Sequence, residues 1–431
     1  MARGAMARGV MVGGAMARGG VLRWVAAYTC SVSGDSVYFV TLSWAASREV
    51  GAGAAGLVLA AGAVPRAVLM LGGGVVADRY GAWRVLIVSD LIRCLAVLAV
   101  ALVHGARLAA LVPLSVAFGV VDALFMPAVG ALPPLLVPAE RLAKVQGMRV
   151  LGVRIANLAG PVLAGAALGT VGVGGAFGLA AALFGASLVL LATLRIPRTA
   201  PTEFTVKPES DSVPEPAPES APEPATLLDQ FREGLHYVRA HARLRRLVIV
   251  VALSELCFSG PVAAAVVLLV AERHWSGGTV GWILGAFSVG GAATGSVMAA
   301  RAERLRHVEV TIAGSLLLTS ALLLTQGATP RAVAIGVAAV LGAATGVTMV
   351  LTNARVQTEA DPRLLGRVTA VTTLGTLGLS PLIYPLVGVV AQRWGTETFF
   401  VGCAAVCLAA VMVLIGSVGS GTSLREPAQQ P

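Results

Sequence analysis

The chain has 431 residues, of which 56% are hydrophobic and only 13% are charged, and its mean hydropathy is +0.82. A soluble domain carries about 25% charged residues, so lipid rather than water must surround most of this chain. Basic residues outnumber acidic ones 32 to 22, but no basic patch is interleaved with aromatic residues, which argues against a nucleic-acid partner. The five cysteines and five histidines show no metal-ligand spacing, so we expect neither a metal site nor a cofactor.

The amino-terminal half begins with a Gly-rich tail and continues as long apolar stretches. Residues 1–20 repeat the tetrapeptide MARG three times and are predicted to be a disordered basic tail. A membrane-spanning helix needs about 20 mostly apolar residues. Residues 21–196 contain six such stretches, numbered here as spans one to six, at 22–46, 52–76, 84–104, 108–127, 147–168 and 173–195.

A polar segment interrupts the apolar pattern in the middle of the chain. Residues 197–225 are rich in Pro, Glu, Ser and Ala, a composition typical of a disordered linker. Residues 226–246 follow with an apolar stripe at helical spacing and arginines at the far end. They predict an amphipathic helix, either lying on the inner membrane surface or simply extending span seven.

The carboxyl-terminal half repeats the pattern of the first. Residues 247–418 contain spans seven to twelve, at 247–271, 278–300, 308–326, 332–353, 369–391 and 397–418, and residues 419–431 form a predicted cytoplasmic tail. The loop before span five places Lys144 where the loop before span eleven places Arg367, a weak internal repeat. The sequence therefore predicts an all-α membrane protein of about twelve helices in two six-helix bundles, an arrangement found in secondary transporters.

Basic residues indicate the orientation. With the amino terminus inside, the inner loops carry clusters of cations and the outer loops carry mostly single ones. The inner set is Arg79, Arg84, Arg141, Lys144, Arg301, Arg304, Arg306, Arg363 and Arg367, and the outer set is Arg48, Arg107, Arg273, Arg331 and Arg393. Because cytoplasmic loops are enriched in Lys and Arg, both termini are predicted to be cytoplasmic.

The turn between spans two and three is the most informative motif. Its glycines loosely imitate a dinucleotide-binding loop, but a membrane helix precedes them where that fold needs a strand. The turn instead resembles the signature Gly-x-x-x-Asp-Arg-x-Gly-x-x-Arg of the major facilitator superfamily, with Ala82 at a position that is commonly basic. The matching residues are Gly74, Asp78, Arg79, Gly81 and Arg84.

This turn also makes physical sense as a conformational latch. Gly74 permits close helix approach and Gly81 permits a sharp turn. The resemblance implies that Asp78 meets the positive end of another helix, expected to be span eleven, in one conformation only; such contacts contribute about 0.3–2 kcal/mol. We expect Asp122, near the inner end of span four, to pair with an arginine of this turn. A purely topological turn is the alternative.

Further motifs resemble the macrolide-exporter and enterobactin-exporter branch of drug:proton antiporters. They are Ser31-Val-Ser-Gly-Asp35, Val64-Pro65-Arg66, Ser89-Asp90-Leu-Ile-Arg93, Phe125-Met-Pro127-Ala and Gln357-Thr-Glu359-Ala-Asp361. In span five, Gly160, Pro161 and Gly165 resemble the antiporter motif of that family, with alanine at 156 and 164 in place of two of its glycines.

Charged residues inside the spans are candidates for coupling, because each costs at least about 2.5–3.5 kcal/mol at the bilayer centre. Asp35 in span one and Arg66 in span two lie at similar depths, so they are predicted to pair, either for proton coupling or as a permanent salt bridge. Glu255 in span seven is a second coupling candidate or a residue reaching the inner interface. Asp90 and Arg93 are expected to neutralise one another.

The function predicted from these features is proton-coupled export of hydrophobic or amphipathic small molecules, of drug, macrolide or siderophore type. The partners are the substrate, protons and the lipid bilayer, and the protein is expected to be a monomer in the cell membrane. The only lysines, Lys144 and Lys207, do not follow glycine, so no phosphate-binding loop exists for ATP-driven transport. The spans contain no cluster of residues typical of an intramembrane active site, so the sequence does not indicate an enzyme. A lysophospholipid or other lipid transporter, and a membrane sensor that moves nothing, remain as alternatives.

Overall fold

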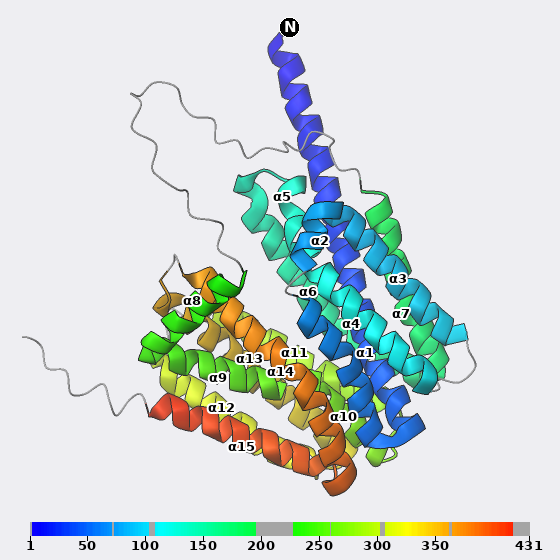
Figure 1. Cartoon of the computed structure of the whole chain (residues 1–431), viewed down its shortest axis with the longest axis vertical. Coiled ribbons are helices and arrows are strands. Elements are labelled where there is room, and N and C mark those ends of the chain that lie inside the picture. Colours follow the sequence, from blue (N-terminus) through cyan, green and yellow to red (C-terminus); the bar gives the residue numbers. More distant parts are fainter. Residues whose placement is uncertain are drawn as a thin grey trace, which may run out of the picture.

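The computed structural model describes residues 2–70, 73–102, 108–194, 227–258, 260–301, 307–361 and 364–416, and every regular element within these ranges is a helix (Figure 1). The helices of the amino-terminal half are α1 (Ala2–Leu69), α2 (Gly73–Tyr80), α3 (Ala82–Leu102), α4 (Leu108–Ala131), α5 (Pro133–Leu136), α6 (Ala139–Thr170) and α7 (Gly172–Ala192). Those of the carboxyl-terminal half are α8 (Leu227–Ala240), α9 (Ala242–Phe258), α10 (Gly260–Glu272), α11 (Gly278–Arg301), α12 (Val308–Gln326), α13 (Arg331–Glu359), α14 (Leu365–Trp394) and α15 (Thr396–Ile415).

The first element, α1, contains both of the first two predicted spans. They join at Gly51, whose φ of 82° and ψ of 175° break the helix and reverse the chain. A residue with a Cβ rarely adopts such a positive φ, so glycine is required at this turn. Residues 2–20, predicted to be a disordered tail, are instead helical at the start of α1. This part of the prediction is corrected: although the segment is Gly-rich, it continues a helix that already exists, and extension of a helix needs no new nucleus.

Ten helical segments within the described residues are long and apolar enough to cross a membrane, and each coincides with a predicted span. The predicted spans at 22–46 and 369–391 are also helical, within α1 and α14, but are not among these ten. Span one is more polar than the ten segments because it carries Ser31, Ser33, Asp35 and Ser36. The full number of twelve spans and the side of the termini stay predictions.

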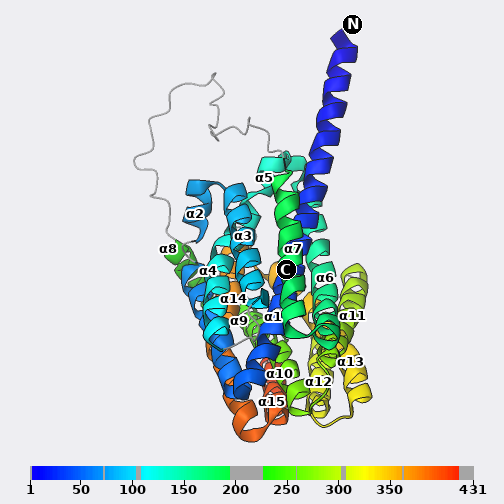
Figure 2. The ribbon, with the colours of Figure 1, turned by 90° about the vertical axis from the view of Figure 1, so that its right-hand side faces the viewer.

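The hydrophobic core shows how the two halves meet. One buried cluster joins both halves near Gly51 and includes Val37, Phe177, Val267 and Phe400. At the opposite end of the helices each half has its own cluster, around Trp24 in the first half and around Leu316 in the second. The halves therefore share a core at one end and separate towards the other, as Figure 1 and Figure 2 show.

The amphipathic segment predicted at 226–246 forms two helices that are interrupted at His241. Its first part, α8, does not stand alone on a membrane surface but packs against α9 and α14. Glu233 pairs with Arg367, and the Tyr237 hydroxyl accepts a hydrogen bond of 3.1 Å from the backbone N–H of Asp361. The linker at 197–225 and the tail at 419–431 lie outside the described residues.

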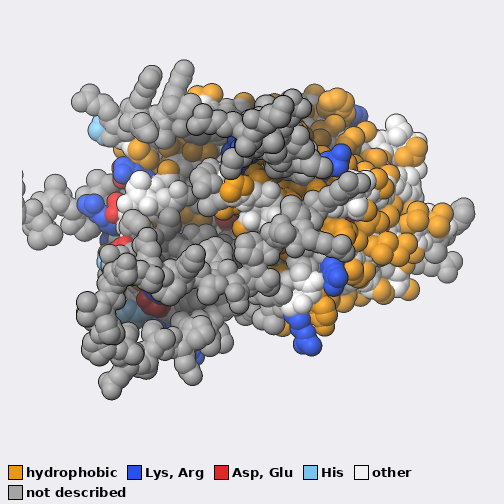
Figure 3. All heavy atoms as spheres, turned by 90° about the horizontal axis from the view of Figure 1, so that it is seen from above, with side chains coloured by type: hydrophobic (Ala, Val, Ile, Leu, Met, Phe, Trp, Pro, Cys, Tyr) orange, Lys and Arg blue, Asp and Glu red, His pale blue; other side chains and the backbone are white. Residues whose placement is uncertain are grey.

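Several basic side chains lie at the end of the molecule at which the halves separate. Figure 3 looks onto this end and shows Lys and Arg side chains spread around the face, with a broad apolar area beside them. This is the distribution expected where apolar helix sides give way to a membrane surface.

Candidate functional site

A central cavity of about 660 Å³ lies where the two halves separate. Its walls come from both halves: α1 and α4 contribute Asp35, Arg66 and Asp122, and α9 and α14 contribute Glu255 and Tyr384. A second cavity, of about 570 Å³, adjoins it and shares Glu255, Ser36, Phe39, Asn157, Gly260 and Ala263 with it. Within the described residues, no group of three or more His, Cys, Asp or Glu side chains has an arrangement that could hold a metal ion.

Arg93 on α3 is the centre of a charged cluster beside this cavity. The guanidinium is fully buried, with Nη1 3.4 Å from Asp35 Oδ2 and 3.7 Å from Asp90 Oδ1. Its Nη2 donates to Asp122 Oδ1 on α4. The Phe125 ring covers the guanidinium at 4.2 Å, within the range of a cation–π contact. One cation therefore joins carboxylates from α1, α3 and α4.

The carboxylates of this cluster differ in how completely they are bonded. Asp90 is fully buried and accepts hydrogen bonds from Ser31 Oγ at 2.9 Å and Ser187 Oγ at 2.5 Å. Asp35 is 30% exposed at its side chain and faces the cavity, and its ion pair with Arg93 at 3.4 Å is not supplemented by serine hydrogen bonds of the kind that Asp90 accepts. The Oδ1 atom of Asp35 has no hydrogen-bond partner among the described residues. Asp35 is therefore the least compensated of these carboxylates.

Arg66 occupies the predicted depth but has a different partner. Asp35 and Arg66 were predicted to pair, yet Asp35 contacts Arg93 while Arg66 Nη1 lies 3.6 Å from Asp122 Oδ2. The reason is rotational: depth along two helices does not determine which way their side chains face. Both residues still line the same cavity. The structure thus places the candidates together and corrects their pairing.

Asp122 also differs from the expectation that it would pair with an arginine of the turn after span two. Arg93 and Arg66 both contact it, whereas Arg79 packs over the ring of Tyr80 at 5.7 Å and Arg84 is exposed. Arg93 and Arg66 lie inside the membrane-spanning helices, and they neutralise Asp122 there.

The turn itself adopts the backbone expected of it. Gly81 has a φ of +85° and separates α2 from α3. Gly74 and Asp78 lie on α2, but the side-chain contacts of Asp78 and the surroundings of Gly74 lie outside the described residues. The role of this turn as a latch stays a prediction.

The antiporter-like motif on α6 lies between the halves. A Cβ on Gly160 would lie 2.5 Å from Cβ of Ser36 on α1. A Cβ on Gly281 of α11 would lie 2.9 Å from both Cα of Gly165 and the carbonyl oxygen of Pro161. A similar contact joins α1 to α14, where Gly56 meets Gly388. Because no side chains separate the backbones there, these helices close the Gly51 end of the molecule.

Sequence analysis missed the role of Arg93, which it assigned to local neutralisation of Asp90. The signal was present: Arg93 lies near the middle of span three, where a charge is most costly, and one aspartate three residues away cannot satisfy a whole guanidinium. Glu255, by contrast, lies where a coupling candidate should, on the wall of both cavities and partly buried.

The chain is similar to known membrane transporters. The family model described as the Major Facilitator Superfamily matches residues 24–376 and 247–430. The multidrug efflux pump Tap of Mycobacterium tuberculosis is 26% identical over 385 residues, covering 87% of both chains, and Tap of Mycobacterium bovis gives the same values. Among solved structures, the nucleoside transporter NupG has a TM-score of 0.66 at 12% identity, covering 93% of this chain and 99% of that chain.

The POT family transporter PepTSo also has a TM-score of 0.66, at 10% identity, covering 93% of this chain and 98% of that chain. At such identities these two structures establish the fold alone. The family model, however, extends over nearly the whole chain. This multi-pass cell-membrane protein therefore belongs to the Major Facilitator Superfamily of transporters.

Proposed function

We propose that the protein exports hydrophobic or amphipathic small molecules in exchange for protons, by alternating access to the central cavity. The observation that carries this proposal is the charged cluster on the wall of that cavity, with Asp35 as its most exposed carboxylate. The similarity to the efflux pump Tap supports export, and the geometry supports the coupling.

The charges of the cluster favour uptake of one proton. Three carboxylates face two guanidiniums, so one carboxylate is in excess at neutral pH. These groups are Asp35, Asp90, Asp122, Arg66 and Arg93. A proton on Asp35 neutralises the cluster, and because Asp35 Oδ1 accepts no hydrogen bond within the described part of the chain, a proton on this atom breaks none there.

Arg93 is the switching group in this mechanism. It lies between Asp35 and Asp122, so protonation of Asp35 leaves the guanidinium with its other two carboxylates. Loss of the proton restores the attraction between Arg93 and Asp35 and draws α1 towards α3. The protonation state of one carboxyl is thereby linked to the position of the first span of α1, whose two spans together contact α4, α6, α7 and α14.

The cavity suits the proposed substrate class. Its volume of about 660 Å³ falls within the range of about 300–1,000 Å³ typical of small-molecule pockets. Apolar and aromatic side chains such as Phe39, Val251 and Tyr384 line it beside the carboxylates. Entry of one proton down a membrane potential of 100 mV supplies about 2.3 kcal/mol, enough for an export gradient of tens-fold.

The glycine contacts indicate which end of the molecule is closed in this structure. The halves are joined near Gly51 and the cavity lies towards the other end, so with cytoplasmic termini this is an inward-facing state. Export then requires α6 and α11 to separate at Gly165 and Gly281, together with closure of the opposite end.

Inverted vesicles from an exporter-deficient bacterium test this function. With the lumen acidified, macrolides, dyes and siderophores are added in turn, and proton release from the lumen is followed for wild type, Asp35→Asn and Glu49→Gln. Glu49 is exposed near the Gly51 turn, so it provides the same chemical change away from the cavity. We expect release with wild type and Glu49→Gln, and at least ten-fold less with Asp35→Asn. Release that is unchanged in Asp35→Asn, or no release by wild type with any compound, would contradict the proposal.

A further inference from the structure

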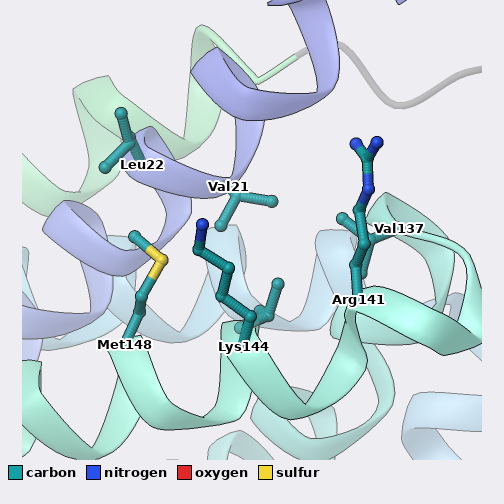
Figure 4. Close-up of a pocket in the computed structure, with 7 residues that line it drawn as sticks. Val21, Leu22, Val137, Arg141, Lys144 and Met148 are labelled. Carbon is teal, nitrogen blue, oxygen red and sulfur yellow. The ribbon is translucent and has the colours of Figure 1, made fainter. Parts of the chain in front are cut away.

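A separate cavity of about 400 Å³ lies between α1 and the start of α6 (Figure 4). It shares no lining residue with the central cavity. Its lining is formed by five apolar side chains and two basic ones: Val21, Leu22, Val137, Val145, Met148, Arg141 and Lys144. We call this the α1–α6 groove.

The two basic residues lie on one face of α6. Arg141 and Lys144 are three residues apart, so their side chains project in similar directions. Figure 4 shows the Lys144 amine pointing towards Val21 on α1, whereas the Arg141 guanidinium extends away from it on the other side of Val21. Both cations therefore line the groove together with its apolar side chains.

Neither cation forms an ion pair with an acidic side chain in the described part of the chain. The side chain of Glu140 lies outside that part. Both residues are exposed. Arg141 lies in the first turn of α6, where a positive charge opposes the helix dipole. The helix dipole therefore does not account for Arg141, whereas an anion bound near Arg141 and Lys144 would be attracted by both.

The walls beneath the cations select an amphiphile rather than a small ion. Leu22 is 58% exposed on the outer side of α1, and Val145 and Met148 continue the apolar surface along α6. The groove lies at the end of the helices that the basic loops assign to the cytoplasm, and the cytoplasmic leaflet is the one that carries anionic lipids.

We propose that the α1–α6 groove binds one anionic phospholipid from the inner leaflet. Arg141 and Lys144 hold the phosphate of the headgroup, and the upper part of an acyl chain lies against Leu22, Val145 and Met148. The bound lipid bridges α1 and α6, both of which also line the central cavity. This proposal goes beyond the transport function and is testable without any substrate.

The test uses the full chain purified in detergent, to which phosphatidylglycerol is added. Native mass spectrometry measures the affinity for the first bound lipid in wild type and in Arg141→Gln/Lys144→Gln. Because each basic residue near an anionic lipid strengthens attraction, we expect binding at least ten-fold weaker in the double variant. Phosphatidylglycerol should also raise the melting temperature of wild type and not of the variant, since a ligand that binds only the folded state stabilises it.

A matched control removes two cations from the same end of the molecule but away from the groove. Arg239→Gln/Arg243→Gln changes exposed arginines on α8 and α9, and its affinity should stay within two-fold of wild type. A charge-preserving pair, Arg141→Lys/Lys144→Arg, should retain binding and excludes misfolding as the cause of a loss.

Three outcomes would overturn the proposal. One is an affinity for phosphatidylglycerol that is the same in wild type and in Arg141→Gln/Lys144→Gln. Another is an equal loss in the control on α8 and α9, which would indicate general attraction to basic residues. The third is full competition by soluble glycerol phosphate, which would show that the groove binds a phosphate without its acyl chain.

Discussion

The two halves of the molecule fill their interiors with different polar chemistry. In the first half, α3 carries Asp90 and Arg93, the only charged residues that are fully buried in the described part of the chain. The corresponding helix of the second half, α12, carries hydroxyl groups instead. Ser315 Oγ lies 2.7 Å from Thr348 Oγ1 on α13, and Thr319 donates to the carbonyl of Ser315.

This difference indicates a division of labour. Hydroxyl groups that bond to the preceding helical turn are satisfied locally and stay neutral at any pH, whereas a carboxylate cluster around one guanidinium changes its bonding with every proton. We infer that the first half carries the proton and the second half provides the opposing wall, including Glu255. Four substitutions test this contrast, taken from the largest expected effect to the smallest.

Arg93→Met should produce the largest loss of stability. It leaves Asp90 buried without its cation, and removing one partner of a buried ion pair costs about 3–5 kcal/mol. Unfolding of the purified protein in detergent measures this loss. Arg93→Met/Asp90→Asn should recover part of it, because no unpaired buried charge then remains on α3. A loss below about 1 kcal/mol for Arg93→Met would contradict the central position of Arg93.

Gly281→Val should force the halves apart where α6 meets α11. Gly281 approaches Gly165 with no room for a side chain, whereas a Cβ on Gly336 of α13 would meet no atom within 4 Å, so Gly336 provides the control. In a Ser36→Cys background, a membrane-impermeant thiol reagent added from outside should label the cavity at least ten-fold faster with Gly281→Val. The labelling rate with Gly336→Val should match that of the Ser36→Cys protein. Equal rates in all three proteins would contradict the claim that α6 and α11 close the Gly51 end of the molecule.

Ser315→Ala in the second half should have a moderate effect. It removes one hydrogen bond between α12 and α13, worth about 0.5–1.5 kcal/mol, and leaves Thr348 bonded to the carbonyl of Ala344. Thermal unfolding and the vesicle assay together measure stability and transport. We expect transport within two-fold of wild type, and a ten-fold loss of coupling would place proton chemistry in the second half.

Glu233→Gln on α8 should have the smallest effect. Its pair with Arg367 is partly exposed, with Glu233 at 52%, and exposed ion pairs contribute about 0–1 kcal/mol. Unfolding measurements at low and high salt should therefore differ little between this variant and wild type. A loss above about 2 kcal/mol would show that α8 is held to α14 mainly by this contact.

Much of the architecture was predictable because the bilayer determines element length. Ten predicted spans coincide with helices that are long and apolar enough to cross a membrane. The reversal at Gly51 lies in the predicted loop between spans one and two, and Gly81 turns the chain as its motif requires. These features depend on local composition and on glycine, both of which a sequence displays directly.

The pairing of charges was not predictable in the same way. Asp35 and Arg66 share a depth, but the rotation of each helix decides their partners, and that rotation comes from packing across the whole bundle. Arg93 reaches Asp35 and Asp122 from a helix between them, over a separation of 58 and 29 residues respectively. Periodicity within one span carries no information about such contacts. It placed the candidate residues at the cavity without revealing how they bond.

The most direct test of the central claim counts protons on purified protein. A compound that passes the vesicle assay is added in weakly buffered detergent solution, and proton release is measured for wild type, Asp35→Asn and Glu255→Gln. The proposed mechanism predicts about one proton per bound substrate for wild type and Glu255→Gln, and none for Asp35→Asn, because one carboxylate is in excess in the cluster. Release by Asp35→Asn equal to that of wild type would contradict it.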